Sequence, residues 1–169
     1  MIAAIACVDR DFNIGKDNHL LFHIPQDMAL FKTLTTNAVV VMGRKTYESI
    51  PNRPLKDRIN IVLSHDKDYK ASAIVINNFN KAVDLIHEYE SNNHTVYIIG
   101  GAEIYTLFQD LYDILILTQV HTTIYGADSK FKIDDIQSYK KYPLIHNYFE
   151  YNDTLIGYSI NIYIKDRSI

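Results

Sequence analysis

The apolar residues of this chain gather in short continuous runs, and each run is followed by a turn or by a segment with helical spacing. A run without polar alternation is typical of a strand that is buried on both faces, as in a parallel sheet flanked by helices. The expected strands of this kind are Ile2–Val8, Ala38–Met42, Ile59–Leu63, Ala73–Ile76, Thr95–Ile99 and Ile114–Val120.

Helical spacing marks the segments between several of these runs. Pro25 predicts the start of the first helix, because its fixed φ and missing N–H suit the first helical position. Pro51 and Pro54 end the second helix, and Asn78 is a suitable N-cap for the third. The expected helices are the segment from Pro25, then Arg44–Ile50, Phe79–Tyr89 and Ala102–Leu111.

Strands that alternate with helices predict an α/β fold with a central, twisted and mostly parallel sheet. We expect about eight strands, about four helices and a single domain over residues 1–169. The segment Ser159–Lys165 alternates polar and apolar residues, which is typical of a half-buried strand near a sheet edge. We therefore expect an antiparallel C-terminal hairpin there. Residues 126–147 are rich in Tyr and Lys and are expected to be mostly loop.

The composition is that of an ordinary globular protein, with 47% hydrophobic and 22% charged residues. The net charge of −3 comes without a basic block, so neither nucleic acid nor a membrane surface is expected as a partner. The single cysteine, Cys7, lies in an apolar run and is expected to be a small buried hydrophobe. Because no apolar run approaches the ~20 residues of a membrane span and no basic leader begins the chain, we expect a cytoplasmic monomer.

Asp27 is the candidate for chemistry on the first expected helix. It shares an otherwise apolar helical face with Met28 and Phe31. A carboxylate in such surroundings is poorly solvated, and its charged form needs a partner. It could hold a cationic or amidine-like ligand, or help to move a proton. An acidic residue in a first helical turn is also favoured by the helix dipole without any function.

Two junctions that carry glycine follow buried strands. Gly43 and the pair Gly100-Gly101 each stand where an apolar strand gives way to a helix. Glycine allows a ligand to approach the backbone, and ligands of α/β sheets collect at the carboxyl ends of the strands. Neither junction carries a usual nucleotide fingerprint, and each by itself is compatible with a tight turn. Together they predict a phosphate-rich ligand that lies across the strand ends.

Four polar residues could surround a phosphate monoester, such as the 2′-phosphate that separates NADP from NAD. These residues are Arg44, Lys45, Ser64 and His65. Solvated surface charge is the commoner role for any one of them. No metal site is expected, because His19 and His23 lack a companion Cys or carboxylate cluster.

Several motifs occur in an order and spacing that belong together. They are Ile5-Ala6-Cys7, Ile14-Gly15 with Asn18, Ile24–Lys32, Val41–Ile50, Arg53-Pro54-Leu55 leading to Arg58, and Ile99–Tyr105. The most specific are the Pro-x-Asp helix and Met-Gly-Arg-Lys-Thr followed by Glu-Ser-Ile. From residue 1 to about residue 131, and more weakly in the last strand, the chain resembles the single-domain dihydrofolate reductases of bacteria and phages.

The resemblance implies NADPH-dependent reduction of 7,8-dihydrofolate to 5,6,7,8-tetrahydrofolate, in support of thymidylate and one-carbon metabolism. Asp27 would anchor the pterin, and Thr118 would support it through its hydroxyl and a water. Arg58, helped by Lys32, would hold the glutamate tail, because a guanidinium pairs bidentately with carboxylate. The implied substrate-binding residues are Ile5, Ala6, Asp27, Met28, Phe31, Lys32, Ile50, Leu55, Arg58, Ile99, Tyr105 and Thr118.

NADPH is the implied cofactor. Gly100-Gly101 would carry its pyrophosphate, Tyr105 would lie near the nicotinamide, and the loop around residues 15–20 would close over it. The implied cofactor-binding residues are Ala6, Cys7, Ile14, Gly15, Asn18, His19, Leu20, Gly43, Arg44, Lys45, Thr46, Leu63, Ser64, His65, Asn77, Ile99, Gly100, Gly101, Ala102, Glu103, Ile104 and Tyr105.

The chain departs from the family pattern at two places. Leu21-Phe22 stands where the family commonly has Pro-Trp, so the indole N–H that often helps to hold a water near the carboxylate is missing. Gly126-Ala127-Asp128 stands where the family often has Gly-Asp, which affects the loop contact assigned to Asp128.

Two other functions remain open at this point. One is another NADPH-dependent pteridine or pyrimidine reductase on a similar scaffold, and Asp27 beside a ring slot with Arg58 nearby argues against it. The other is a catalytically idle NADPH-binding or phage structural protein, and the intact Asp27 with both glycine junctions argues against that loss of activity.

Overall fold

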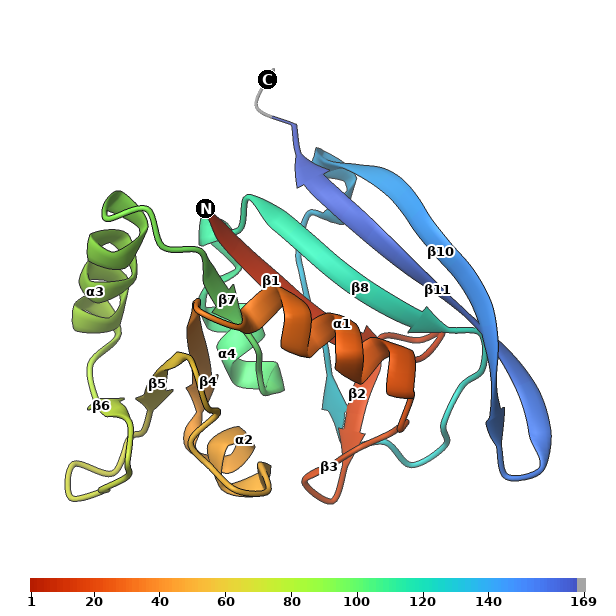
Figure 1. Ribbon diagram of the computed structural model, residues 1–169, viewed down its shortest axis with the longest axis horizontal. Helices are drawn as coiled ribbons and strands as arrows, with labels where there is room; N and C mark the ends of the chain where they lie inside the picture. Colours follow the sequence, from red (N-terminus) through yellow and green to blue (C-terminus); the bar gives the residue numbers. More distant parts are fainter. Residues whose placement is uncertain (167–169) are drawn as a thin grey trace.

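The main sheet has eight strands, whose arrangement Figure 1 shows. The computed structural model describes residues 1–166. In sheet order the strands are β10 (Tyr139–Tyr151), β11 (Thr154–Lys165), β8 (Ile114–Val120), β1 (Ile2–Val8), β7 (Val96–Ile98), β4 (Val39–Gly43), β5 (Ile59–Leu63) and β6 (Ile74–Ile76). The six strands from β8 to β6 are parallel, whereas β11 is antiparallel to β8 and β10 is antiparallel to β11.

Helices and a second, smaller sheet complete the described part of the chain. The helices are α1 (Pro25–Thr35), α2 (Arg44–Ser49), α3 (Phe79–Ser91) and α4 (Ala102–Leu107), with 3-10 turns η1 (Gln109–Leu111) and η2 (Ile136–Ser138). The second sheet has the order β3 (His19–Leu20), β2 (Asn13–Lys16) and β9 (Ser129–Lys130). The mostly parallel sheet with its antiparallel C-terminal strands confirms the predicted fold class. Residues 167–169 of the expected domain lie outside the described residues.

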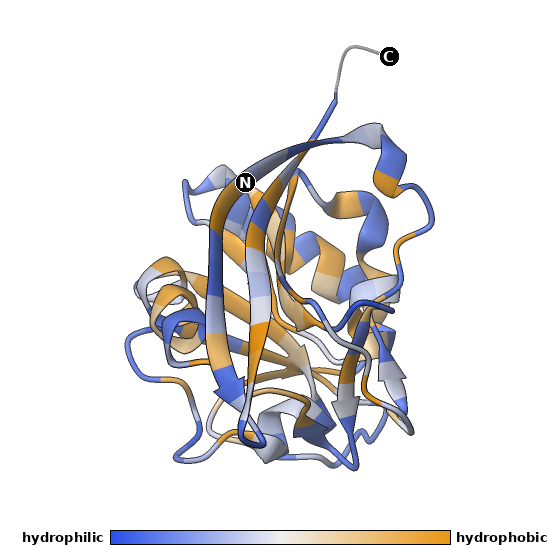
Figure 2. Cartoon of the chain, turned by 90° about the vertical axis from the view of Figure 1, so that its right-hand side faces the viewer, coloured by the Kyte–Doolittle hydropathy of each residue, from blue (hydrophilic) through white to orange (hydrophobic). Residues whose placement is uncertain are grey.

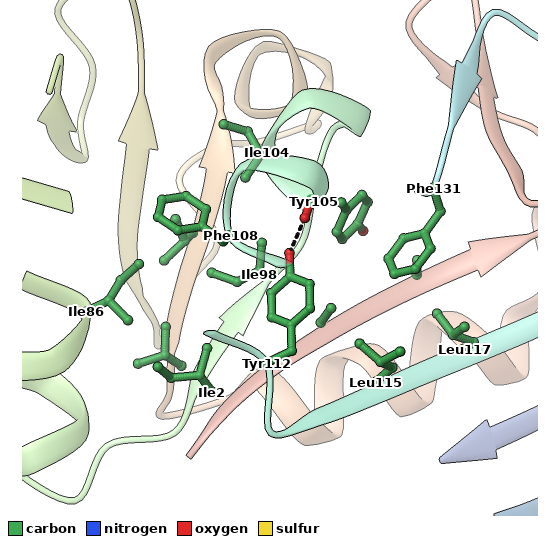
Figure 3. Close-up of a cluster of buried hydrophobic side chains, with 14 of the residues drawn as sticks. Ile2, Ile86, Ile98, Ile104, Tyr105, Phe108, Tyr112, Leu115, Leu117 and Phe131 are labelled. Carbon is green, nitrogen blue, oxygen red and sulfur yellow. Dashed lines mark hydrogen bonds between the residues drawn. The ribbon is translucent and has the colours of Figure 1, made fainter. Parts of the chain in front are cut away.

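The main sheet separates two hydrophobic cores, which explains why its central strands are apolar at every position. Ala4 of β1 lies in the core that contains residues of α3 and α4, part of which Figure 3 shows. Its neighbour Ile5 lies in the core on the other face, with Tyr47 of α2 and Phe31 of α1. Successive strand residues point to opposite faces, so a strand covered on both sides needs no polar alternation.

Buried tyrosines tie α4 to the central strands through backbone carbonyls. The Tyr105 hydroxyl donates to the Ile5 carbonyl at 2.7 Å. The Tyr112 hydroxyl donates to the Tyr105 carbonyl at 2.7 Å, the bond that Figure 3 shows. The Tyr139 hydroxyl donates to the Tyr112 carbonyl at 3.1 Å. Burial raises the pKa of Tyr139 to about 12, so this hydroxyl keeps its proton. These bonds fix the position of Tyr105 beneath the Gly100-Gly101 junction.

The prediction of mostly loop for residues 126–147 was wrong over its second half. β10 begins at Tyr139, and every residue from 140 to 148 is exposed, so the strand has no buried face to impose alternation. The register also shifts between Pro143 and Ile145. β10 is the edge strand seen in front in Figure 2, and β11 lies one position inside it. Lysine, proline and a bulge on such a strand discourage pairing with another edge.

The expected loop before α1 contains a short hairpin that the sequence reading omitted. Asp17 and Asn18 have φ of 51° and 61°, the left-handed pair of a two-residue hairpin turn between β2 and β3. Strands β2 and β3 are too short to show a periodic pattern in the sequence.

A stack of rings over Gly157 joins the C-terminal hairpin to β8. His121 directly follows β8 and stacks on His146 of β10, with ring centroids 5.1 Å apart and planes 28° apart. A Cβ on Gly157 would lie 3.0 Å from Nδ1 of His121 and 3.4 Å from Cε1 of Tyr148. The missing side chain therefore leaves the space in which the His121 ring crosses β11.

We expect Gly157→Ala to destabilise the protein by about 1 kcal/mol, because the added methyl forces the packed rings apart. In a His121→Ala background the same change should be neutral or stabilising, since only the loss of glycine's backbone freedom in the unfolded chain remains. Urea denaturation of the four proteins gives the free energies of unfolding. A loss of the same size in both backgrounds would contradict the packing described.

Candidate functional site

A cavity of about 550 Å³ opens at the carboxyl ends of the parallel strands. Every residue of the implied cofactor-binding set except Gly100 lines it. The cavity also has lining residues that the sequence reading missed, namely Ser49, Asp66, Ile76, Asn78, Phe79, Leu107 and Ser129. Asn78 and Phe79 adjoin the predicted Asn77 and could have been included, whereas Ser129 reaches the site through the pairing of β9 with β2 and carries no sequence signal.

The two glycine junctions meet in the cavity wall. The Gly43 N–H donates to the Gly100 carbonyl at 2.8 Å, so the ends of β4 and β7 lie together. A Cβ on Gly101 would lie 3.3 Å from Oγ1 of Thr46. Gly100 has φ of +104°, and a Cβ there would lie 2.9 Å from Cε2 of Tyr105. Side chains at these positions would fill or distort the wall, so the bare backbone fits the close approach of a pyrophosphate.

The four polar residues singled out for a phosphate monoester all line the same cavity. Ser64 is buried, at 7% exposure. The guanidinium of Arg44 lies over the ring of Tyr69, 5.8 Å from its centroid. Nε2 of His65 lies 3.2 Å from Oε1 of Glu103, and both side chains are largely exposed. This end of the cavity therefore offers cationic donors and a hydroxyl.

Asp27 lies at the first turn of α1 and is held from the sheet by Thr118. The Thr118 hydroxyl donates to Oδ1 of Asp27 at 2.5 Å, a direct bond where the family resemblance implied a hydroxyl and a water. Burial raises the pKa of Asp27, and the bond from Thr118 lowers it only in part. In β1, next to Thr118, burial and the Asp27 charge raise the pKa of the Cys7 thiol, which remains protonated.

Apolar side chains pack together beside α1, and of these only Ile99 also lines the large cavity. Among the implied substrate-binding residues, those that pack in the core beside α1 and α2 are Ile5, Phe31, Ile50, Leu55 and Ile99. Met28 is 40% exposed and Lys32 is exposed, so neither is held by packing in the free protein. The carboxylate of Asp27 and this apolar cluster thus share helix α1, since Phe31 lies one turn after Asp27.

Arg58 lies over Phe31 of this apolar cluster. Its guanidinium carbon is 5.8 Å from the ring centroid, and its Nε is buried without a hydrogen-bond partner among the described residues. Asn60 shapes the turn that carries it: its amide donates to the carbonyls of Leu55 and Arg58, at 2.9 and 3.0 Å. The sequence reading missed Asn60, although an isolated amide within an apolar strand was a visible signal.

Two carboxylates hold the loop near the cavity mouth. Asp128 bridges two segments of the chain, and Asp9 is buried. Oδ2 of Asp128 accepts from the Asp17 N–H at 2.8 Å, and the Asp128 N–H donates to the Gly15 carbonyl at 3.1 Å. Burial disfavours the charge of Asp9, but hydrogen bonds from Ile124 and from its own loop outweigh that and lower its pKa. The hairpin β2–β3 is therefore attached to the segment after β8.

Phe22 occupies the place of the missing tryptophan as a packing residue only. It is 5% exposed and meets Phe149 and Tyr151 edge-on, with centroids 6.0 and 5.5 Å away. It offers no donor near Asp27. Within residues 1–166, no helix is long and apolar enough to cross a membrane, and no three His, Cys, Asp or Glu side chains gather as a metal site.

Comparisons with known proteins agree with this geometry. Residues 1–165 match the family described as dihydrofolate reductase. The chain is similar to dihydrofolate reductase of Haemophilus influenzae, 40% identical over 113 residues that cover 67% of this chain and 68% of the relative. It is 37% identical to that of Bacillus subtilis over 127 residues, covering 75% and 73%. The structure of dihydrofolate reductase from Enterococcus faecalis complexed with NADP(H) and RAB-propyl aligns with a TM-score of 0.83 and 28% identity, covering 98% of this chain and 96% of that one.

We expect Asp27→Asn to make the ligand-free protein more stable at neutral pH, by about 0.5–2 kcal/mol. The pKa of Asp27 is raised above its ordinary value of 3.8, so the folded chain holds this proton more tightly than the unfolded chain does. The stability from this group is present below pH 3.8 and is lost as the pH rises through the folded pKa. Asparagine has no such loss.

Thermal unfolding of both proteins between pH 4 and pH 8 measures this effect. The difference between variant and wild type should grow with pH and then level off. A variant that is equally destabilised at every pH would show that the carboxylate is a structural requirement instead of a strained charge.

Proposed function

The chain belongs to the dihydrofolate reductase family, and we propose that it reduces 7,8-dihydrofolate to 5,6,7,8-tetrahydrofolate with NADPH as the reductant. The observation that carries this proposal is the position of Asp27. A poorly solvated carboxylate, bonded to Thr118, lies on α1 near a cluster of apolar side chains, and the cavity at the strand ends includes bare glycine backbone in its wall.

The residues of the large cavity suit NADPH. The junction of Gly43 with Gly100 and Gly101 would accept the pyrophosphate, and the cationic end with Arg44 and Lys45 would accept the adenosine 2′-phosphate. NADPH, when bound, would supply the hydride that reduces the pterin at C6. The protein's task is then to hold two flat rings face to face, which the fixed backbone and Tyr105 favour.

Asp27 would anchor the pterin through its 2-amino and N3 edge. The raised pKa of Asp27 reflects a charge that water and Thr118 together do not satisfy, and an amidine-like edge offers the missing donors. The fixed negative charge of Asp27 would also favour the protonated form of the pterin. Water admitted beside the bound pterin would deliver the proton to N5.

Arg58 would hold the glutamate tail of the substrate. Its guanidinium is seated on Phe31, and its buried Nε lacks a partner among the described residues. A carboxylate would satisfy that donor in the bidentate geometry that arginine provides. The exposed Lys32 would add a second, weaker attraction.

Replacing Asp27 by Asn should lower kcat/KM for dihydrofolate about 10²–10⁴-fold at neutral pH, because the charge that favours the protonated pterin is removed. The loss should shrink at low pH, where the substrate arrives already protonated. NADPH oxidation followed at a series of pH values measures this. A variant as active as wild type at pH 7 would rule out the proposed role of Asp27.

Replacing Arg58 by Gln should raise KM for dihydrofolate about 10–100-fold, the range for a lost charge-assisted hydrogen bond. The KM for a dihydropterin without the glutamate should hardly change. Lys56→Gln, which removes an exposed cation two residues away, is the matched control. Equal effects of Arg58→Gln on both substrates would remove Arg58 from the tail site.

A further inference from the structure

Arg44 is held over an aromatic ring and by no carboxylate. It begins α2, and its guanidinium carbon lies 5.8 Å from the centroid of the Tyr69 ring. Within residues 1–166 Arg44 forms no salt bridge and no side-chain hydrogen bond. The contact is electrostatic, because a cation is attracted to the negative face of a ring. It leaves the N–H donors of the guanidinium free.

The Tyr69 ring is itself held in place. Its ring packs against the core that contains Tyr47, and the charge of Glu48, at the other end of α2, acts on its hydroxyl. Burial and the Glu48 charge raise the pKa of Tyr69, so the hydroxyl stays a donor. The loop between β5 and Tyr69 is braced by bonds from Asp66 N–H to Ser64 Oγ, at 3.2 Å, and from Tyr69 N–H to the Asp66 carbonyl, at 3.4 Å.

The type of partner decides what Arg44 can bind. A carboxylate would fix the guanidinium but would also occupy its donors and neutralise its charge. An aromatic ring fixes the guanidinium and leaves both its donors and its charge available to an incoming anion. His65 shows the contrast, because on the same cavity wall it already faces the carboxylate of Glu103.

We propose that Tyr69 is a positioning residue for cofactor choice: it seats Arg44 so that the guanidinium meets the ribose 2′-phosphate of NADPH, which NADH lacks. This inference rests on the proposed function, in which NADPH binds the large cavity. Tyr69 is not among the residues that line that cavity, so it acts through Arg44 and makes no contact of its own.

Tyr69→Leu removes the ring and keeps an apolar side chain, and Tyr69→Phe keeps the ring and removes only the hydroxyl. We expect Tyr69→Leu to weaken binding of adenosine 2′,5′-bisphosphate about two- to five-fold, the range for a partly exposed cation–ring contact, and to leave binding of 5′-AMP unchanged. Tyr69→Phe should bind both probes nearly as wild type does. Isothermal titration gives the dissociation constants, and thermal unfolding confirms that each variant is folded.

The KM ratio of NADH to NADPH should fall in Tyr69→Leu by the same factor. In the Arg44→Gln background, Tyr69→Leu should have no further effect on either probe, because the residue through which it acts is gone. An equal loss for both probes, a loss in Tyr69→Phe as large as in Tyr69→Leu, or an additive loss in the double variant would each overturn the inference.

Arg44→Gln separates failure of this inference from failure of the proposed site. If Arg44→Gln does not weaken binding of adenosine 2′,5′-bisphosphate, the assignment of the 2′-phosphate to this end of the cavity is wrong. If Arg44→Gln weakens it about tenfold and Tyr69→Leu does not weaken it at all, the cofactor assignment stands and the role of Tyr69 alone is wrong.

Discussion

The site depends on one hydrogen bond, the bond that Thr118 donates to Asp27 across the interface between the sheet and α1. Burial opposes the charge on Asp27, and a single hydroxyl does not offset that opposition, so the pKa of the carboxylate remains raised. The free protein therefore keeps a charge that is under-solvated but well oriented. In the proposed function, a ligand with amidine-like donors would supply what the protein lacks at this carboxylate.

Strand β1 joins the apolar core beside α1 to the large cavity. Ile5 belongs to the core beside α1, while Ala6 and Cys7 line the large cavity. The Ile5 carbonyl also accepts the Tyr105 hydroxyl, which carries the position of α4 back to the same strand. These residues are consecutive on one buried strand. The packing of both cores therefore resists small displacements between the apolar residues beside α1 and the cavity.

The sequence was informative where one physical rule dominated and silent where several competed. Strands buried on both faces, such as β1 and β8, were predicted at their observed bounds, because continuous burial leaves a continuous apolar run. β10 was missed, since an exposed edge strand with a proline and a register shift has no periodicity. The cavity lining followed from family motifs. Ser129 and the ring under Arg44 depend on contacts between segments far apart in the chain, and no local pattern specifies them.

The arginines around the site are held in place in the same way, and their charge stays available for an anion. Each lies over an aromatic ring, and within residues 1–166 none of them forms a salt bridge. The pairs are Arg44 with Tyr69 and Arg58 with Phe31, each at 5.8 Å. The chain carries more acidic than basic residues, so carboxylate partners were available in number. Aromatic rings in place of carboxylates restrict the movement of the guanidinium without neutralising its charge. Its N–H donors therefore stay available for ligands that carry phosphate or carboxylate.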